Sequence, residues 1–394
     1  MKWTYQTTIK ACFIGYIVQA IVNNFAPLLF VTFQNTYQIS LSKIALLITV
    51  NFGVQLATDF AATLFVDKIG YKISVVAAHG FSALGFVLLT VLPEVMDPFY
   101  GILISLSICA VGGGLIEVLI SPIMESCPTE NKETAMSLLH SFYCWGHVGV
   151  VLLTTIFFYG WGISYWKVLT LLWTIIPLGN GFLFTKVPIA PLVTEDVSEL
   201  TIKELFQHKA FWIFLLLMIC AGASEQSVSQ WASVFAERGL GISKTMGDLA
   251  GPMAFAIMMG SARAIYGKYG HRLHLTRFMK ISTFLCIGSY LIMVFVPLPV
   301  VSLMGCAISG FSVGIMWPGT FSTASSVIKQ GKTAMFAMMA LAGDLGCSIG
   351  PAVVGALAEA MDNRIQFGIL GAILFPVLFL FFLRKMERRM AASE

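Results

Sequence analysis

Long apolar stretches separated by short polar ones recur along the whole chain. Each stretch has the roughly 20 residues that an α-helix needs to cross the hydrocarbon core of a bilayer. Few charged residues interrupt them. The pattern therefore predicts twelve membrane-spanning helices, near residues 8–33, 42–66, 72–92, 98–126, 132–158, 165–186, 210–236, 245–266, 273–296, 299–328, 332–358 and 364–383.

The composition supports the same fold class. Only 11% of the residues are charged and 57% are hydrophobic, whereas soluble domains carry about 25% charged residues. So little charge would not cover the surface of a soluble protein of this size, but it suits helices whose outer faces contact lipid. The sequence thus predicts an all-α membrane protein rather than a soluble globular one.

The longest polar stretch divides the chain into two halves. It runs from 187 to 209, and we predict it to be a cytoplasmic linker between six-helix bundles at 1–186 and 210–394. With both termini in the cytoplasm, most of the 24 lysines and arginines lie on the cytoplasmic side, as the positive-inside rule requires. The exceptions are Lys43, Lys167, Arg238, Lys244 and Arg364. We therefore expect a multi-pass protein of the cell membrane with both termini cytoplasmic.

The two halves repeat a set of motifs in the same order. Residues 67–72 match residues 267–272, each at the end of the second helix of its half, and Pro122 matches Pro318 in the fourth helices. Glycines precede both prolines, so we expect helices four and ten to be interrupted. Corresponding Gly/Pro-interrupted helices mark the binding site of transporters built from repeats. Small residues also let helices pack closely, and both roles are open for these glycines.

Few ionisable residues interrupt the predicted helices, and the ones we single out are Asp59, Glu117, Glu225, Arg263 and Asp344. Such groups cost about 2.5–3.5 kcal/mol each on insertion scales and by default mark pathways or relays. Asp59 and Arg263 lie nearer the cytoplasmic ends, which favours structural or gating pairs. Glu117, Glu225 and Asp344 lie deeper, and a carboxyl group in an apolar cleft is easier to protonate than one in water. We predict these three as proton-coupling residues, Glu117 first; a permanently neutral, hydrogen-bonded Glu117 is the alternative.

Amide, carboxyl and indole side chains gather on helices one, four, seven and ten. The predicted substrate-binding residues are Gln19, Asn23, Asn24, Glu117, Tyr143, Glu225, Gln226, Gln230, Trp231 and Trp317. Amides and a carboxylate offer paired donors and acceptors to vicinal hydroxyls, and an indole offers a flat apolar face. This set suits a neutral, polyhydroxylated solute such as a sugar. For any one of these residues, hydrogen bonding between helices is an equally good explanation.

The segment Asp67-Lys68-Ile69-Gly70-Tyr71-Lys72 resembles the loop signature of the major facilitator superfamily. In that signature a Gly precedes Asp-Lys/Arg-x-Gly-Arg/Lys-Arg/Lys; here Thr63 stands at the leading position and Tyr71 at a usually basic one. Asp67, near a helix end, can pair with basic groups across the cytoplasmic gap, so we predict Asp67 and Lys68 as gating residues in addition to Asp59 and Arg263. A plain solvated turn is the alternative for the loop.

Four further stretches resemble the fucose–proton symporter family, which includes glucose/galactose carriers. They are Asn23-Asn24-Phe25-Ala26-Pro27-Leu28-Leu29, Gly114-Leu115-Ile116-Glu117 with Ser121-Pro122, Gly222-Ala223-Ser224-Glu225, and Ile315-Met316-Trp317-Pro318-Gly319-Thr320-Phe321. The resemblance implies that Glu117 is a protonatable residue and that Tyr143 stands in place of a helix-five Asn. Pro27 occupies the place of the family's helix-one Asp, and Asp344 that of a glycine. These departures leave the solute open.

The sequence as a whole predicts a secondary active transporter that moves a small, sugar-like solute by alternating access, coupled to protons or to sodium. An exporter or a carrier of a charged or amphipathic solute is a second hypothesis, and a non-transporting sensor is a third. No nucleophile–base or metal-ligand spacing emerges, and the eight cysteines lie singly in apolar segments. We therefore expect no enzymatic activity, cofactor, metal ion or nucleic-acid partner, and a monomer in the bilayer.

Overall fold

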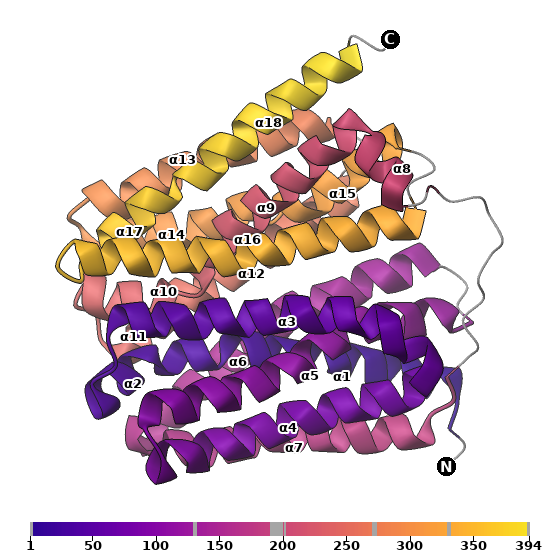
Figure 1. Ribbon diagram of the computed structural model, residues 1–394. Coiled ribbons are helices and arrows are strands. Elements are labelled where there is room, and N and C mark those ends of the chain that lie inside the picture. Colours follow the sequence, from indigo (N-terminus) through magenta and orange to yellow (C-terminus); the bar gives the residue numbers. More distant parts are fainter. Residues whose placement is uncertain are drawn as a thin grey trace. The chain divides into compact units, whose positions relative to one another are not determined.

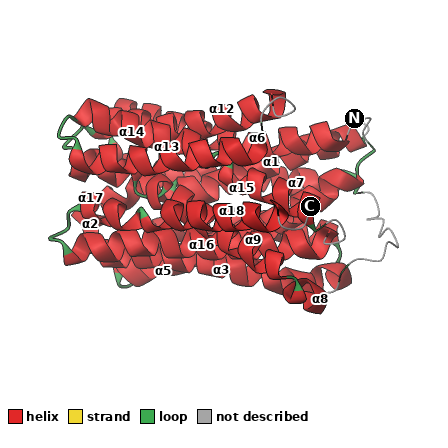
Figure 2. Ribbon diagram, turned by 90° about the horizontal axis from the view of Figure 1, so that it is seen from above, coloured by secondary structure: helices red, strands yellow, loops and turns green. Residues whose placement is uncertain are grey.

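The computed structural model describes residues 3–128, 132–189, 200, 202–269, 274–328 and 332–391. Nearly all of this part of the chain is helical (Figures 1 and 2). The helices form two compact units, Met1–Thr194 and Glu195–Glu394. The all-α fold class is therefore confirmed, and each unit is built from the helices of one sequence half.

The first unit contains six long helical segments, drawn in indigo to magenta in Figure 1. Its elements are α1 (Tyr5–Asn24), η1 (Ala26–Leu29), α2 (Phe30–Tyr37), α3 (Leu41–Ile69), α4 (Tyr71–Val95), α5 (Pro98–Ser126), α6 (Lys132–Trp161), η2 (Ile163–Tyr165) and α7 (Trp166–Lys186). Gly70 joins α3 to α4 with φ +92°, a backbone conformation that only glycine adopts without strain. This explains the glycine in the Asp67–Lys72 motif.

The second unit, which ends in the yellow helix of Figure 1, has more interruptions. Its elements are α8 (Ile202–Gln207), α9 (Lys209–Ser229), α10 (Ala232–Val234), η3 (Phe235–Gly239), α11 (Lys244–Asp248), η4 (Leu249–Met253), α12 (Ala254–Tyr269), α13 (Leu275–Phe295), α14 (Pro299–Val313), α15 (Met316–Val327), α16 (Lys332–Ala360), α17 (Ile365–Ala372) and α18 (Leu374–Ala391). Both η3 and η4 are π-helical turns. Such turns are rare and occur mostly within longer helices.

Eleven helical segments within the described residues are long and apolar enough to cross a membrane. The twelfth segment expected from the sequence, 245–266, is also helical, as α11, η4 and α12 in succession. It is less apolar than the others because it contains Asp248, Arg263 and several glycines. The structure is therefore that of a multi-pass membrane protein with six helical segments in each unit.

Helix packing repeats from one unit to the other. In the first unit α1 packs on α6, α3 on α5, and α4 on both α5 and α7. In the second unit α9 packs on α16, α12 on α14, and α13 on both α14 and the α17–α18 segment. These pairs join the same ordinal helices of each half, so the motif repeat in the sequence reflects a repeat in three dimensions.

The positions of the helix breaks differ in part from those expected. The tenth helix is interrupted between α14 and α15, at Gly314 and Ile315, but the fourth helix, α5, continues through Pro122. One proline removes a single backbone hydrogen bond and can be tolerated near a helix end. Close packing also holds the glycines of α5 in place, because a Cβ atom on Gly112 would overlap α4. The expectation of a broken helix four is therefore wrong.

The first and seventh helices are broken instead. Phe25 separates α1 from the 3-10 turn η1, which has Pro27 in its first turn, and Gln230 and Trp231 separate α9 from α10. Each break lies beside predicted substrate-binding residues. Broken helices expose backbone groups that must be satisfied by protein or by a hydrated cavity.

Apolar side chains cover much of the exposed surface. Phe182 of α7 is 64% exposed, Ile175 of the same helix is 60% exposed, and Phe60 of α3 is 61% exposed. By contrast, Gln19, Asn23, Asn24 and Gln55 are buried. Lipid-facing apolar residues around a polar interior are what a bilayer environment requires.

Candidate functional site

In the first unit, Glu117 pairs with an amide. Gln19 Nε2 on α1 donates a hydrogen bond to Glu117 Oε2 on α5 at 2.6 Å. Gln19 is buried, and its second polar atom, Oε1, has no hydrogen-bond partner. Glu117 is half-buried. The carboxyl group is thus held by one neutral donor, with an unused acceptor on the same side chain.

A second contact joins the same two helices one turn away. Tyr16 OH of α1 and Ser121 Oγ of α5 lie 2.9 Å apart. Tyr16 precedes Gln19 by one turn, and Ser121 follows Glu117 by one turn, as expected for neighbouring antiparallel helices. Two polar contacts therefore align α1 with α5 at the candidate site, and neither Tyr16 nor Ser121 was predicted as a site residue.

The predicted asparagines of α1 are held by neighbouring helices. Asn24 Nδ2 donates to Ala20 O at 2.9 Å and to Tyr143 OH of α6 at 3.3 Å. Asn23 Oδ1 accepts from Gln55 Nε2 of α3 at 3.0 Å. The structure thus brings together Asn24 and Tyr143, two of the predicted residues, and adds Gln55. Sequence reasoning missed Gln55, although it lies one turn before Asp59 in the same predicted helix.

Asp59 lies against the glycine-rich part of α5. Its Oδ1 atom is 2.8 Å from the position that a Cβ atom on Gly114 would occupy, and the residue is only 6% exposed. The glycine makes this approach possible. Asp59 therefore packs within the first unit, at the interface between α3 and α5.

In the second unit, Glu225 pairs with a cation. Its Oε2 atom on α9 is 3.6 Å from Arg263 Nη2 on α12. Its Oε1 atom accepts a hydrogen bond from Gln226 Nε2 at 3.3 Å. A buried charge usually needs such a partner. The sequence predicted both residues but assigned them to different roles, Glu225 to the solute and Arg263 to gating.

The amides of α9 form a short chain that continues from this pair. Gln230 Nε2 donates to Gln226 Oε1 at 3.0 Å, and both residues are buried. The neighbouring Trp231 is fully buried, and its indole N–H donates to Pro351 O of α16 at 3.1 Å. The N–H of Trp231 is therefore hydrogen-bonded and its ring is buried, as in a residue that packs between helices.

Trp317 follows the break between α14 and α15 and packs against α16. A Cβ atom on Gly343 would overlap its six-membered ring, so the indole lies directly on the α16 backbone. Phe321, one turn later, is edge-on to Trp317 with ring centroids 6.2 Å apart. Asp344 follows Gly343 and is 7% exposed. Trp317 and Asp344 thus belong to the α15–α16 region.

Of the predicted loop residues, Lys68 is exposed near the end of α3. The side chain of Asp67 lies outside the described part of the structure, as do residues 190–199 and 201 of the predicted linker.

A charged cluster that sequence reasoning missed lies where α10, η3 and α11 meet. Ser233 Oγ donates to Asp248 Oδ1 at 2.6 Å, and Lys244 Nζ contacts Asp248 Oδ2 at 2.8 Å and Glu237 Oε1 at 3.2 Å. The Asp248 side chain is fully buried. The sequence feature that could have revealed the cluster is the presence of Asp248 inside the predicted helix 245–266. The cluster fastens the seventh helical segment to the eighth.

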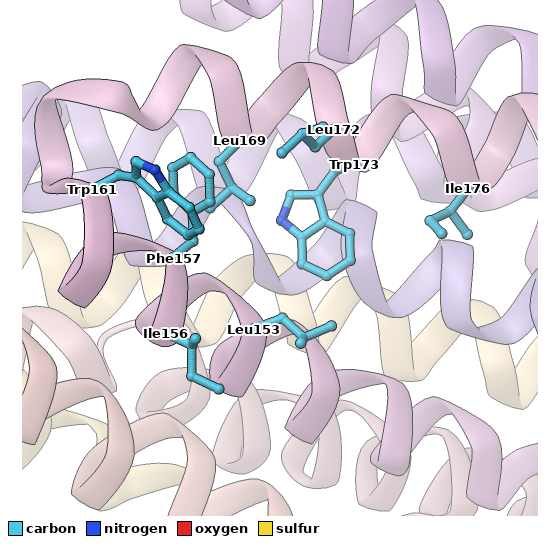
Figure 3. Close-up of a pocket in the computed structure, with 8 residues that line it drawn as sticks. All are labelled: Leu153, Ile156, Phe157, Trp161, Leu169, Leu172, Trp173 and Ile176. Atoms are coloured by element: carbon cyan, nitrogen blue, oxygen red, sulfur yellow. The ribbon is translucent and has the colours of Figure 1, made fainter.

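Among the described residues, no three His, Cys, Asp or Glu side chains lie close enough to hold a metal ion. An apolar groove of about 270 Å³ lies between α6 and α7, lined by Leu153, Ile156, Phe157, Trp161, Leu169, Leu172, Trp173 and Ile176 (Figure 3). The Trp173 indole nitrogen has no hydrogen-bond partner. The groove has no charged side chain in its lining and does not include any predicted site residue.

Comparison with known proteins places this geometry in context. The sequence profile described as Major Facilitator Superfamily matches residues 12–351. A stretch of 190 residues is 24% identical to the membrane protein MosC of Rhizobium meliloti. That stretch covers 47% of this chain and 46% of MosC, so the match spans about half the length of that relative.

Several solved structures are similar over almost the full chain. A bacterial homologue of the human lysosomal transporter Spinster, inward-facing and occupied, has a TM-score of 0.79 at 11% identity and covers 96% of each chain. The nucleoside transporter NupG has a TM-score of 0.76 at 12% identity, covering 97% of this chain and 99% of its own. The E. coli fucose:proton symporter FucP has a TM-score of 0.66 at 15% identity, and the match covers 97% of this chain and 99% of FucP. At these identities the likeness concerns the fold alone.

Proposed function

The chain belongs to the Major Facilitator Superfamily, and from that premise we propose that it moves a small, sugar-like solute across the membrane by proton-coupled alternating access. Alternating access in this superfamily rests on movement of one helical half against the other around a fixed site. The chemistry that drives it must come from groups whose charge can change. Glu117 is the leading candidate.

The contact between Gln19 and Glu117 carries this proposal. When Glu117 is ionised, Oε2 accepts the hydrogen bond from Gln19 Nε2 at 2.6 Å. When it is protonated, its O–H group can donate to Gln19 Oε1, which is buried and accepts no hydrogen bond in this state. Both protonation states are therefore satisfied by one amide side chain. A group of this kind can take up and release a proton and keep a hydrogen bond to the same amide in both states.

Glu225 is less suited to this role. Its carboxylate lies beside the Arg263 guanidinium, and a neighbouring cation favours the ionised form of a carboxyl group. We therefore assign coupling to Glu117 first, with Glu225 and Asp344 as secondary sites. A proton that crosses 100 mV supplies about 2.3 kcal/mol. At about 1.4 kcal/mol per tenfold, this sustains an accumulation of roughly forty-fold.

The solute contacts in this proposal come from the remaining polar residues of the broken helices, from Tyr143 of the continuous helix α6 and from Trp317. Asn23, Asn24 and Tyr143 supply amide and hydroxyl groups in the first unit, and Gln226 and Gln230 supply amides in the second. These neutral groups suit hydroxyl-bearing solutes. Trp231 is better explained as a packing residue, because its N–H donates to Pro351 O.

Solute uptake into proteoliposomes tests the proposal. A panel of monosaccharides is offered with and without an inward proton gradient, and with sodium in place of the gradient. We expect gradient-driven accumulation of at least one sugar-like solute by the wild type. In Glu117→Gln accumulation should be lost, while exchange of solute against solute is retained because the Gln19 contact persists.

Glu125→Gln is the matched control, since Glu125 lies exposed on the same helix, α5. It should accumulate solute like the wild type. The proposal is overturned if no solute in the panel responds to the proton gradient, or if Glu117→Gln accumulates solute as well as the control does.

A further inference from the structure

The fifth helix of the first unit, α6, carries polar side chains along one face. Tyr143, His147 and Thr154 are spaced by four and then seven residues, so they lie on the same side of the helix. We call these three residues the α6 polar face. A Cβ atom on the neighbouring Gly146 would lie 2.9 Å from Ala20 Cβ, so α6 meets α1 at this level. Tyr143 OH, the first group of the face, accepts a hydrogen bond from Asn24 of α1.

His147 differs from His79, which is also buried in the first unit. The ring of His79 on α4 is bonded through both nitrogens, to Val75 O at 2.7 Å and to Asn180 Nδ2 at 2.8 Å. His147 is 2% exposed, and neither of its ring nitrogens has a hydrogen bond to a described residue. A neutral imidazole has one donor and one acceptor, and burial without partners is costly for both.

Thr154 shows the same contrast with threonines of other helices. The hydroxyls of Thr170, Thr283 and Thr320 are buried, and each donates to the backbone carbonyl one turn earlier, at 2.8, 2.7 and 2.6 Å. Thr154 is fully buried, but its hydroxyl has no hydrogen-bond partner in the described part of the chain. Two of the three side chains of the α6 polar face are therefore buried with their donors and acceptors unpaired.

Unpaired donors and acceptors along one helix face match the hydroxyl groups of a bound molecule. From these observations we infer that His147 and Thr154 bind hydroxyl groups of the transported solute, beside Tyr143 on the same face. Seven residues separate them by about 10 Å along the helix axis. One hexose bridges this distance with a hydrogen bond at each end. The inference deepens the proposed function and rests on it for the transport step.

A purely structural role for the two residues predicts a different effect on stability. If His147 and Thr154 held helices together, replacing them with apolar residues would destabilise the protein. Removing a buried polar group that has no partner should instead leave the unliganded protein at least as stable. Loss of stability in exchange for function is common at binding sites. The direction of the stability change therefore separates the two roles.

Thermal stability of the purified full-length protein in detergent tests the inference without requiring transport. The probes are the D and L enantiomers of glucose, galactose and fucose, because the two enantiomers of a sugar share its general stabilising effect as an excluded solute. We expect at least one enantiomer to stabilise the wild type more than its mirror image does. His147→Leu and Thr154→Val should each weaken that binding by about fivefold or more. Without sugar, each variant should be at least as stable as the wild type.

Thr155→Val is the matched control. Thr155 is buried and its hydroxyl also has no partner among the described residues, but it lies about 100° around the helix from Thr154. This variant should distinguish the enantiomers as the wild type does. His147→Gln keeps a donor and an acceptor, so it should recover part of the binding lost in His147→Leu.

Two outcomes overturn the inference: no enantiomer stabilises the wild type above its mirror image, or either His147→Leu or Thr154→Val binds the sugar as the Thr155→Val control does. Failure of the proposed function looks different. Enantiomer-selective binding that depends on His147 and Thr154, without uptake driven by a proton gradient, would retain the binding residues and reject proton-coupled transport. Gradient-driven uptake of a sugar that is unaffected by His147→Leu would do the reverse.

Discussion

The two units place a glutamate at the centre of their polar interiors and partner it differently. Glu117 of the first unit is held by an amide at 2.6 Å, whereas Glu225 of the second is held by a guanidinium at 3.6 Å. An amide can serve either protonation state of a carboxyl group, but a guanidinium favours only the ionised one. The difference teaches that two buried glutamates of one fold can have partners of different charge, a neutral amide in one unit and a cation in the other.

The two glutamates stand on different helices of their units, Glu117 on the fourth and Glu225 on the first, but the second and fourth helices meet in a similar way in both units. In the first unit Asp59 of α3 lies against Gly114 of α5, and in the second Arg263 of α12 donates to Gly314 at the end of α14. Both contacts join the second and fourth helices of their unit. An acid in one unit and a base in the other thus occupy related places. The base of the second unit is the one that also contacts a glutamate, Glu225.

Arg263→Leu should have the largest effect on stability. It leaves Glu225 buried without its cation, and breaking a buried pair from one side costs about 3 kcal/mol or more in free energy of unfolding. Denaturant titration of the detergent-solubilised protein measures this change. The double variant with Glu225→Leu should recover most of the loss, because neither charge then remains. A double variant as unstable as the single one would contradict the ion-pair explanation.

The substitutions Glu225→Gln and Glu117→Gln should have the next largest effects on stability, and they should differ from each other. Glu225→Gln should lower the free energy of unfolding by about 1–2 kcal/mol, because Arg263 loses its counter-charge while its bond to Gly314 O remains. Glu117→Gln should change it by less than about 0.5 kcal/mol, because two facing amides can pair through both groups. The same titration compares them. Equal costs would mean that the two glutamates do not differ in the way described.

Gln19→Leu should have a smaller effect, a loss of about 1 kcal/mol, since one hydrogen bond to Glu117 disappears but the carboxyl group can be protonated. It should also abolish proton-driven accumulation in the proteoliposome assay, because Glu117 loses the side chain that serves both its states. Gln34→Leu is a control in the same unit, where Oε1 is likewise buried without a partner. Coupled uptake that survives in Gln19→Leu would remove the amide from the coupling step.

Tyr143→Phe should have the smallest effect. The 3.3 Å contact with Asn24 Nδ2 is long, and Asn24 also donates to Ala20 O, so the free energy of unfolding should change by about 0.5 kcal/mol at most. If Tyr143 binds the solute, the half-saturating concentration for uptake should still rise several-fold. An unchanged value would assign Tyr143 to helix packing alone.

Much of the fold was predictable from local features. Bilayer length and low charge predict the helices, and the matching motifs at 67–72 and 267–272 predict the repeat. The eighth span was predicted although Asp248 makes it less apolar, because an odd number of helices would scramble the positive-inside bias. The breaks were harder to predict: Pro122 remains inside a continuous helix, whereas Pro27 follows the break of the first one. Neither proline by itself reveals whether tertiary packing will hold the helix straight.

Glu117 was identified from sequence as a protonatable residue, and that assignment remains a prediction for uptake assays. What the amino-acid order determined by itself was the number of helices, their grouping into two sixes, and the few polar residues that have to be buried among them. Only the tertiary structure decided which side chains became the hydrogen-bond and ion-pair partners of the two buried glutamates. Gln19 reaches Glu117, and Arg263 reaches Glu225, because helix rotation and depth bring side chains from distant segments together. Sequence spacing specifies the face of one helix but not which face of another helix it meets.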